Sequence, residues 1–332
     1  MSTYLSGIQP SGMQHLGNYF GAIRGHIEAQ REGGEHFYFI ADYHALTTSR
    51  DPEALRERVR ETAITYLALG LDPERATLFR HSDVPEVCEL AWLLACVTGM
   101  GLLERAHSYK DKKAKGIQAT VGLFTYPVLM AADILAYESD RVPVGTDQLQ
   151  HVEMAQDMAG YFNHAYGEVF RRPEPVLPEE GRFARVVGLD GEKMSKSNEN
   201  GIWIFESGKP LAKRIGRIVT DSRAPAEPKD PEELLPFCFL ELFLDSDELE
   251  DWRARTREGG EGAPGYGHMK ARIVEAVEET FAPARVRREE LLADPGEVDR
   301  ILARGAEKAR AIAVGVRDRA LAACGLRNPL PR

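Results

Sequence analysis

Residues 6–23 read SGIQPSGMQHLGNYFGAI and lie between a predicted strand at 3–8 and a predicted helix at 18–31. Glycines stand at positions 7, 12, 17 and 21, a spacing that fits neither the G-x-G-x-x-G dinucleotide fingerprint nor a P-loop. A loop this rich in glycine lets the backbone approach a ligand closely. Because the loop follows the first strand, we expect it at the carboxyl edge of a sheet, where open α/β folds bind ligands.

Strand and helix patterns alternate outward from this stretch. The remaining predicted strands are 36–42, 76–80, 141–144 and 183–189. The next predicted helices are one that opens with Asp51 as N-cap and Pro52 at its first position, and those at 85–97, 126–137 and 149–165. This alternation predicts an α/β fold with a doubly wound, Rossmann-like parallel sheet.

The pattern changes after residue 200. The segment TDSRAPAEPKDPEELLP is rich in proline and charge, and helical stretches such as ILARGAEKARAIAVGVRDRALAACG dominate the rest. We therefore expect a catalytic α/β domain at residues 1–200 and a helical domain at residues 201–332.

Composition narrows the class of protein. The formal net charge of -10 over 332 residues argues against a protein that coats nucleic acid through bulk charge. The N-terminus has no basic start, and no stretch approaches the ~20 apolar residues of a membrane span, so we expect a cytoplasmic protein with no membrane partner. The four cysteines lack metal-ligand spacing, which predicts buried thiols and no structural metal.

Two segments carry the residues expected of an anion-binding site. In the opening loop, free N–H groups where Gly17 and Asn18 begin the helix suit a phosphate, and His15 can donate to its oxygens. Further on, GLDGEKMSKSNENG (188–201) sets Lys193 and Lys196 in a loop bounded by glycines. Taken singly, a surface histidine and a solvated charged loop are the alternative interpretations.

HLGN at 15–18 and KMSKS at 193–197 together resemble the two signatures of class I aminoacyl-tRNA synthetases. The segments SGIQPSG, TYPVLMAADIL (125–135) and VPVGTDQLQH (142–151) resemble those of the bacterial tryptophanyl-tRNA synthetases. The resemblance covers nearly the whole chain and is firmest at residues 4–200. One departure is Leu5, which stands where a bulkier aromatic residue is common in the family.

The resemblance implies a function for many single residues. The catalytic groups it implies are His15, Lys112, Lys193 and Lys196. The implied ATP-binding residues are Gln9, Gly17, Asn18, Gly145, Asp147, Met194 and Ser195. The implied tryptophan-binding residues are Leu5, Gly7, His44, Tyr126, Met130, Asp133, Val142, Val144 and Gln148.

Asp133 has a physical reason to bind tryptophan. Tyr126, Met130 and Asp133 fall on one face of the predicted helix, so one carboxylate sits within an otherwise apolar stripe. The indole ring has one N–H donor and no acceptor, and a carboxylate only accepts. A structural carboxylate paired inside the protein is the alternative interpretation. Similarly, Asp147 offers a carboxylate to ribose hydroxyls, or it caps the helix that follows.

The implied reaction has two steps. Tryptophan attacks the α-phosphorus of ATP to give tryptophanyl-adenylate and pyrophosphate, and the tryptophanyl group then passes to tRNA(Trp). We expect Mg²⁺ to arrive on the ATP phosphates, no resident metal, and a homodimer as in the family. The helical domain would hold the anticodon. Its candidate phosphate contacts are Lys270, Arg272, Arg285, Arg287, Arg288, Arg300 and Arg304.

Three other functions remain open from the sequence. A tyrosyl-tRNA synthetase would also offer a carboxylate to its substrate, here a phenol, but SGIQPSG and the two valines at 142 and 144 favour indole. A small-substrate nucleotidylyltransferase is disfavoured by KMSKS followed by a long helical domain. A non-catalytic paralogue with a regulatory or binding role is disfavoured because the candidate site residues are all intact, namely His15, Asp133, Asp147, Lys193 and Lys196.

Overall fold

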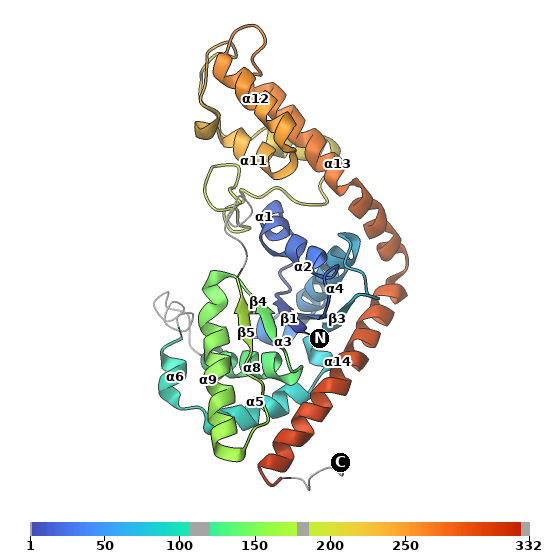
Figure 1. Cartoon of the computed structure of the whole chain (residues 1–332). Coiled ribbons are helices and arrows are strands. Elements are labelled where there is room, and N and C mark those ends of the chain that lie inside the picture. The colour runs from blue at the N-terminus through green and yellow to red at the C-terminus, as the bar shows by residue number, and fades with distance from the viewer. Residues whose placement is uncertain (1, 107–119, 178–185, 327–332) are drawn as a thin grey trace.

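The computed structural model describes residues 2–106, 120–177 and 186–326 (Figure 1). The predicted catalytic residue Lys112 therefore lies outside the described residues, as does the start of the strand predicted at 183–189.

A five-stranded parallel sheet forms the centre of the α/β half. Its strands are β1 Thr3–Ile8, β2 Glu35–Ile40, β3 Ala76–Arg80, β4 Arg141–Pro143 and β5 Glu174–Val176. They lie in the order β3-β2-β1-β4-β5, and every pairing is parallel. This arrangement confirms the doubly wound α/β fold and the first four predicted strands.

The fifth predicted strand is wrong in its described part, residues 186–189. In the described part of 183–189, Val187 makes one isolated antiparallel bridge to Lys193, because this segment turns back as one arm of the KMSKS loop. The fifth strand is instead the short β5, which the sequence hid because it contains Pro175. Proline cannot donate to a sheet ladder, but an edge strand tolerates it.

Helices cover both faces of the sheet. They are α1 Leu16–Asn18, the π-helical η1 Tyr19–Ile23, α2 Arg24–Ala29, α3 Asp42–Ala45, α4 Pro52–Ala68, the short η2 His81–Asp83, α5 Glu86–Val97, α6 Met100–Glu104, α8 Val121–Ala136, η3 Thr146–Gln148 and α9 Leu149–Tyr166. As predicted, Asp51 caps α4 by accepting from two backbone N–H groups, and Pro52 opens that helix. The helix predicted at 126–137 begins five residues earlier, at Val121.

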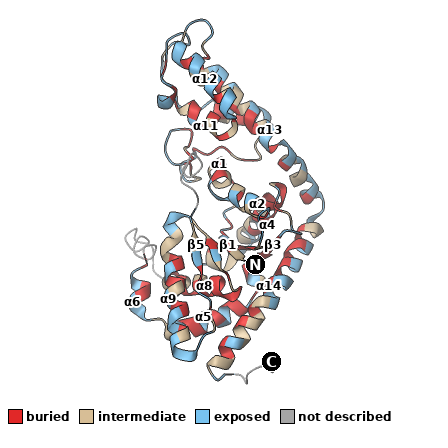
Figure 2. Ribbon diagram, viewed as in Figure 1, coloured by how far each residue is buried: buried red, intermediate tan, exposed pale blue. Residues whose placement is uncertain are grey.

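Two apolar clusters hold these layers together. Figure 2 shows that the buried residues lie on the sides of the helices that face the interior. On one face of the sheet, Ile8, Tyr38 and Leu78 pack with α2 and α4. On the other face, Leu5 and Phe37 pack with α5, α8 and α9. Neighbouring strand residues thus point to opposite sides, as the two-residue period of a strand requires.

The chain after residue 201 is helical. Its helices are α10 Gly208–Ile215, η4 Pro231–Glu233, α11 Leu235–Phe243, α12 Ser246–Glu258, α13 Tyr266–Ala293 and α14 Pro295–Ala323. The long helices α13 and α14 run along one side of the molecule, and α11 and α12 lie at one end (Figure 1).

The last helix packs directly against the α/β half. A Cβ atom at Gly305 of α14 would lie 2.0 Å from the carbonyl oxygen of Leu78 in β3, so only glycine allows this approach. Arg310 of α14 also reaches Glu86 of α5, with nitrogen–oxygen distances of 2.6–3.1 Å. The two halves thus share an interface, and a domain boundary at residue 200 stays a prediction.

The cysteines do not follow the sequence expectation. Cys88, Cys96 and Cys238 are exposed, and Cys324 is half-buried. The prediction of buried thiols is therefore wrong, because positions 88 and 96 fall on the outward side of the amphipathic helix α5. In the described part of the chain, no helix is long and apolar enough to cross a membrane.

Candidate active site

The loops at the carboxyl ends of the strands lie beside a reversal of strand order. The chain moves from β1 outward through β2 to β3 and then returns to β4 on the other side of β1. Open α/β sheets bind ligands at this kind of switch point. The loop after β1 contains HLGN, and the loop after β4 contains Gly145, Asp147 and Gln148.

His15 is a structural part of its own motif. Its Nδ1 accepts a hydrogen bond from the Asn18 backbone N–H at 3.3 Å, and the Asn18 side chain accepts from the His15 N–H at 3.1 Å. Burial and, next, the nearby Lys196 lower the pKa of His15 to about 4. The ring is therefore neutral at physiological pH, and with Nδ1 accepting, Nε2 carries the N–H that can face a ligand.

The HLGN and KMSKS segments touch each other. The Gly17 N–H points at Sδ of the buried Met194 from 3.3 Å, and Lys196 Nζ donates to Ser11 of the opening loop, 3.0 Å from its Oγ. Burial and Arg58 lower the pKa of Lys196. Asn200 accepts from the Ser195 N–H at 2.9 Å and braces the loop, while Lys193 is exposed.

Asp133 lies at the centre of a buried polar cluster. Its side chain is 1% exposed on α8; His44 Nε2 of α3 is 2.7 Å from Oδ2, and His81 Nε2 of η2 is 2.6 Å from Oδ1. Burial raises the pKa of this carboxyl, but His81 and His44 together outweigh burial and hold the pKa below its usual range. The carboxylate is therefore charged although it is buried.

Other predicted tryptophan-binding residues gather near this cluster. The Tyr126 hydroxyl lies 2.7 Å from His151 Nε2, and the ring of His44 lies edge-on to Tyr126. A Cβ at Gly7 would lie 2.7 Å from the Phe39 ring, which explains why glycine stands there. The apolar cluster on the same face of the sheet contains Leu5, Met130, Val142 and Val144.

The loop after β4 holds two predicted polar residues in contact with each other. The Gln148 amide donates to the Asp147 carboxylate at 2.9 Å, and Gly145 caps the short helix η3. Gln9 and Asp147 are exposed at the same edge of the sheet. The structure therefore brings some of the described candidates into direct contact, and their individual roles remain predictions.

Sequence reasoning missed two histidines of this region. His81 follows β3 directly, and His151 lies within the quoted motif VPVGTDQLQH. The position of His81 at the end of a predicted strand was an available signal. A single histidine there has no neighbour in sequence that points to Asp133, so only the fold brings the two together.

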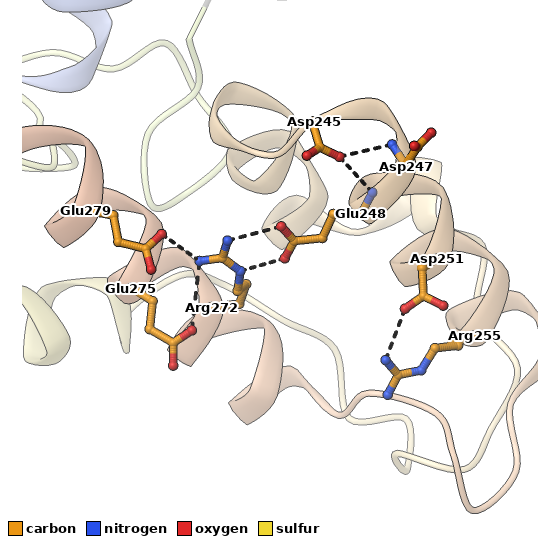
Figure 3. Close-up of polar contacts among 8 residues, drawn as sticks. All are labelled: Asp245, Asp247, Glu248, Asp251, Arg255, Arg272, Glu275 and Glu279. Carbon is orange, nitrogen blue, oxygen red and sulfur yellow. Dashed lines mark hydrogen bonds and ion pairs between the residues drawn. The ribbon is translucent and has the colours of Figure 1, made fainter.

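The basic residues predicted to contact tRNA are already occupied. Arg272 lies between Glu248, Glu275 and Glu279, with its closest contact 2.6 Å from Glu248 (Figure 3). Carboxylates also face Arg285, Arg287, Arg288, Arg300 and Arg304. Lys270 donates to the Gly216 carbonyl oxygen at 2.9 Å. Charge counting in the sequence did not reveal this pairing.

A surface cavity lies apart from the predicted site. It has a volume of about 800 Å³, is lined by residues such as Leu46, Arg56, Asp83 and Leu302, and contains none of the predicted site residues.

His44, His81 and Asp133 offer a donor set that a divalent metal accepts. However, nitrogen–oxygen separations of 2.6–2.7 Å are direct contacts, shorter than the roughly 3.3 Å between ligands around one zinc ion.

The known proteins to which this chain is similar agree with one another in the family they belong to. Residues 1–282 match the family described as tRNA synthetases class I (W and Y). Tryptophan–tRNA ligase from Rhodopirellula baltica is 56% identical over 323 residues, which cover 97% of this chain and 99% of that protein. The Campylobacter jejuni (strain RM1221) tryptophan–tRNA ligase is 51% identical over 309 residues, covering 93% of this chain and 95% of that protein.

Solved structures are similar over almost the full length. Tryptophanyl-tRNA synthetase from Campylobacter jejuni complexed with ADP and tryptophan has a TM-score of 0.91 and 49% sequence identity, covering 98% of this chain and 100% of that one. The Mycoplasma pneumoniae tryptophanyl-tRNA synthetase has a TM-score of 0.78 at 29% identity, covering 98% of each chain.

Proposed function

The chain belongs to the class I tRNA synthetases of the tryptophan and tyrosine type, and from this premise we propose how its site works. Its activity is that of a tryptophan–tRNA ligase, which activates L-tryptophan with ATP and transfers it to tRNA(Trp). The observation that carries the proposal is the direct contact between the opening loop with its HLGN motif and the KMSKS segment.

The first step needs positioning and charge stabilisation rather than a protein nucleophile. The tryptophan carboxylate attacks the α-phosphorus of ATP, and pyrophosphate leaves. Neutral His15 donates from Nε2 to a phosphate oxygen, and Lys196 and Lys193 stabilise the charge that builds on the pyrophosphate. Mg²⁺ enters as part of the MgATP substrate, since Mg²⁺ is usually held by substrate phosphates and water.

Asp133 identifies the amino acid. Its carboxylate accepts the indole N–H, and the apolar residues on the same face of the sheet enclose the ring. Tyr126 and Gln148 bind the α-amino group. The bonds that they make to His151 and Asp147 orient them for that role.

The second step brings in the tRNA. The terminal ribose 2′-OH accepts the tryptophanyl group, and the helical half holds the anticodon. We place the enzyme in the cytoplasm, and no part of the proposal requires a membrane.

We further propose that the enzyme is a homodimer. Large apolar side chains are exposed on neighbouring helices, namely Trp92 of α5, Met100 of α6 and Val121 of α8. A second copy of the chain is the occupant that covers such a face, as in the family. Sedimentation of wild type against Trp92→Glu tests this assembly: a dimer that becomes a monomer supports it, and a wild-type monomer contradicts it.

Amino-acid-dependent exchange of pyrophosphate into ATP tests the proposed function. Exchange is expected with tryptophan and not with tyrosine or phenylalanine. Equal exchange with tyrosine would contradict the substrate, and no exchange with any amino acid would indicate a non-catalytic relative.

A further inference from the structure

The charge on Asp133 is held by histidines alone. Among the described residues, no lysine or arginine forms an ion pair with this carboxylate, although a buried charge is costly without a partner. His44 faces one oxygen, and His81 faces the other. The inference drawn here rests on the proposed function, in which Asp133 accepts the indole N–H.

The two histidines differ in access to solvent. The His44 side chain is 17% exposed, whereas His81 is only 1% exposed. A ligand therefore approaches Asp133 from the side of His44, and His81 closes the far side. Rings surround His81: Phe39 and Tyr43 lie edge-on at 5.2 and 4.9 Å between centroids, and His44 stacks at 5.5 Å.

The other titratable groups that feel the charge of Asp133 add no positive charge. They are Cys88 of α5 and Tyr137, the residue that follows α8, and both are neutral when protonated. Burial and, next, Asp133 raise the pKa of Tyr137. His81 and His44 are thus the described groups that favour the carboxylate over the neutral acid.

A carboxylate has about four lone-pair positions, and two histidines use at most two of them. We propose that His81 is a positioning residue for tryptophan: it holds the Asp133 carboxylate charged and in place, so that a free lone pair meets the indole N–H. His81 does not touch the substrate, and it acts only through Asp133.

Two substitutions of different reach test the proposal. In His81→Gln, an amide N–H can still reach Asp133, whereas in His81→Asn the amide is too short. We expect His81→Asn to raise the tryptophan KM in pyrophosphate exchange about tenfold and to leave the ATP KM nearly unchanged, while His81→Gln stays near wild type. The matched control is His36→Asn. It also removes a buried histidine, but one near the start of β2, whereas His44 and Asp133 lie beyond the other end of that strand.

The pH profile separates positioning from loss of structure. Without His81, burial dominates and raises the pKa of Asp133, so acid converts the carboxylate into a neutral acid. The ratio of the tryptophan KM of His81→Asn to that of wild type should therefore widen as the pH falls from 8 to 6. His36→Asn should give a flat ratio.

An analogue with sulfur in place of the indole nitrogen distinguishes the possible failures. If Asp133→Ala and His81→Asn both lose the preference for tryptophan over this analogue, both proposals stand. If only Asp133→Ala loses it, the assignment of His81 is wrong and Asp133 keeps its role. If Asp133→Ala keeps the preference, the indole acceptor itself is wrong and the role of His81 falls with it.

A different observation, the pairing of basic residues, carries a second inference. Among the described residues from 201 onward, Lys209, Lys213 and Arg217 are the basic side chains that contact neither a carboxylate nor a carbonyl oxygen. All three are exposed. Their four-residue spacing sets them along one side of α10 and of the turn that ends it.

The helix α10, which carries this basic side, lies close to the KMSKS loop: just after the helix, the Val219 N–H donates to the Leu189 carbonyl oxygen at 2.9 Å. The basic side itself faces solvent, because Leu211 and Ile215 are the buried residues of α10. We infer that Lys209, Lys213 and Arg217 contact the phosphate backbone of the tRNA, a role the sequence had assigned to residues that already contact carboxylates or a carbonyl oxygen. This inference also rests on the proposed function.

A matched pair of triple variants tests the tRNA surface. Lys209→Gln/Lys213→Gln/Arg217→Gln removes the unpaired charges, and Arg300→Gln/Arg304→Gln/Lys308→Gln removes three paired charges at the same spacing on α14. Binding of a tRNA(Trp) transcript is measured over a range of salt concentrations. The first triple should lower the salt slope by about two to three and the second by less than one, with pyrophosphate exchange unchanged in both.

If the two triple variants lower the salt slope of tRNA binding equally, bulk charge explains the result and the proposed contact surface is wrong. No effect of the first triple would overturn it as well. Pyrophosphate exchange needs no tRNA. If the wild-type enzyme shows no exchange, the proposed function itself is wrong, whatever the tRNA measurements give.

Discussion

Charge is compensated in opposite ways in the two halves of the molecule. Around Asp133, a buried carboxylate meets two histidines, and none of the lysines and arginines that the structure describes pairs with it. In the helical half, arginines such as Arg272 lie near the surface and are surrounded by carboxylates (Figure 3). A carboxylate that keeps free lone pairs can bind a ligand, whereas an arginine already shared among several carboxylates has little left to offer. Substitution should therefore cost function in the first region and a little stability in the second.

The largest effect is expected at the KMSKS lysines. Lys196→Ala and Lys193→Ala each remove a donor to the leaving pyrophosphate, which costs roughly 3 to 4 kcal/mol, or about 10² to 10³ in rate, in comparable sites. The affinity for tryptophan should barely change. Single-turnover adenylation measures the rate, and Lys308→Ala, which removes a lysine paired with Glu35, is the control. Wild-type adenylation with altered tryptophan binding would contradict the assigned role.

Asp133→Ala comes next. The variant leaves the indole N–H unpaired in a buried site, at a cost of about 1 to 3 kcal/mol. The loss should follow the N–H, so an analogue with carbon or sulfur at that position should bind both proteins about equally poorly. Measuring two ligands against two proteins closes a double-mutant cycle. A coupling energy near zero would mean that Asp133 is structural, as in the alternative interpretation of the sequence.

Glu86 combines features of both regions. Like Asp133 it is buried, with 2% exposure, but Arg310 and Arg317 face it as in the helical half. Burial raises its pKa, yet the bonds from Arg310 and the nearby charges hold that pKa below its usual value. Its stabilising contribution is therefore present above the unfolded-state pKa of about 4.3 and is lost as the pH falls below that value.

Arg310→Met should lower the free energy of unfolding by about 1 to 2 kcal/mol at pH 7. The difference from wild type should shrink as the pH falls from 5 to 3.5. Urea unfolding at several pH values measures it. A difference that stays constant with pH would show that Arg310 acts through packing rather than through the charge on Glu86.

The sequence predicted those features whose cause is local. The spacing of apolar residues gave four strands and most helices of the α/β half, and Asp51 followed by Pro52 marked the start of α4. Glycine and histidine after β1 pointed to the ligand edge of the sheet. Asp133 was singled out as a candidate because it interrupts an apolar helix face.

What the sequence could not predict depends on contacts between distant residues. His81 meets Asp133 only because β3 and α8 end close together, and nothing near position 81 indicates a partner. The basic residues of the helical half looked available because their carboxylate partners lie on other helices or other turns, as Glu248 does for Arg272. The strand β5 is the exception, because it was missed for a local reason: it contains Pro175, and proline is typical of loops.

The smallest effect is expected where the pairing is most complete. Arg272 donates from Nε and Nη2 to the two carboxylate oxygens of Glu248, at 2.6 and 3.1 Å. Its Nη1 lies 3.4 Å from Oε2 of Glu279. Arg272→Met should lower the free energy of unfolding by about 1 kcal/mol or less, because its partners Glu248 and Glu279 are 35% and 69% exposed and ion pairs open to solvent contribute little in water. Urea unfolding at 0.05 M and 1 M salt measures this, and screening should reduce the difference at high salt. Pyrophosphate exchange and the KM for tRNA should equal those of wild type. A raised tRNA KM in a folded Arg272→Met would mean that Arg272 leaves its carboxylates to contact RNA, and the contrast between the two regions would then hold only for the enzyme without tRNA.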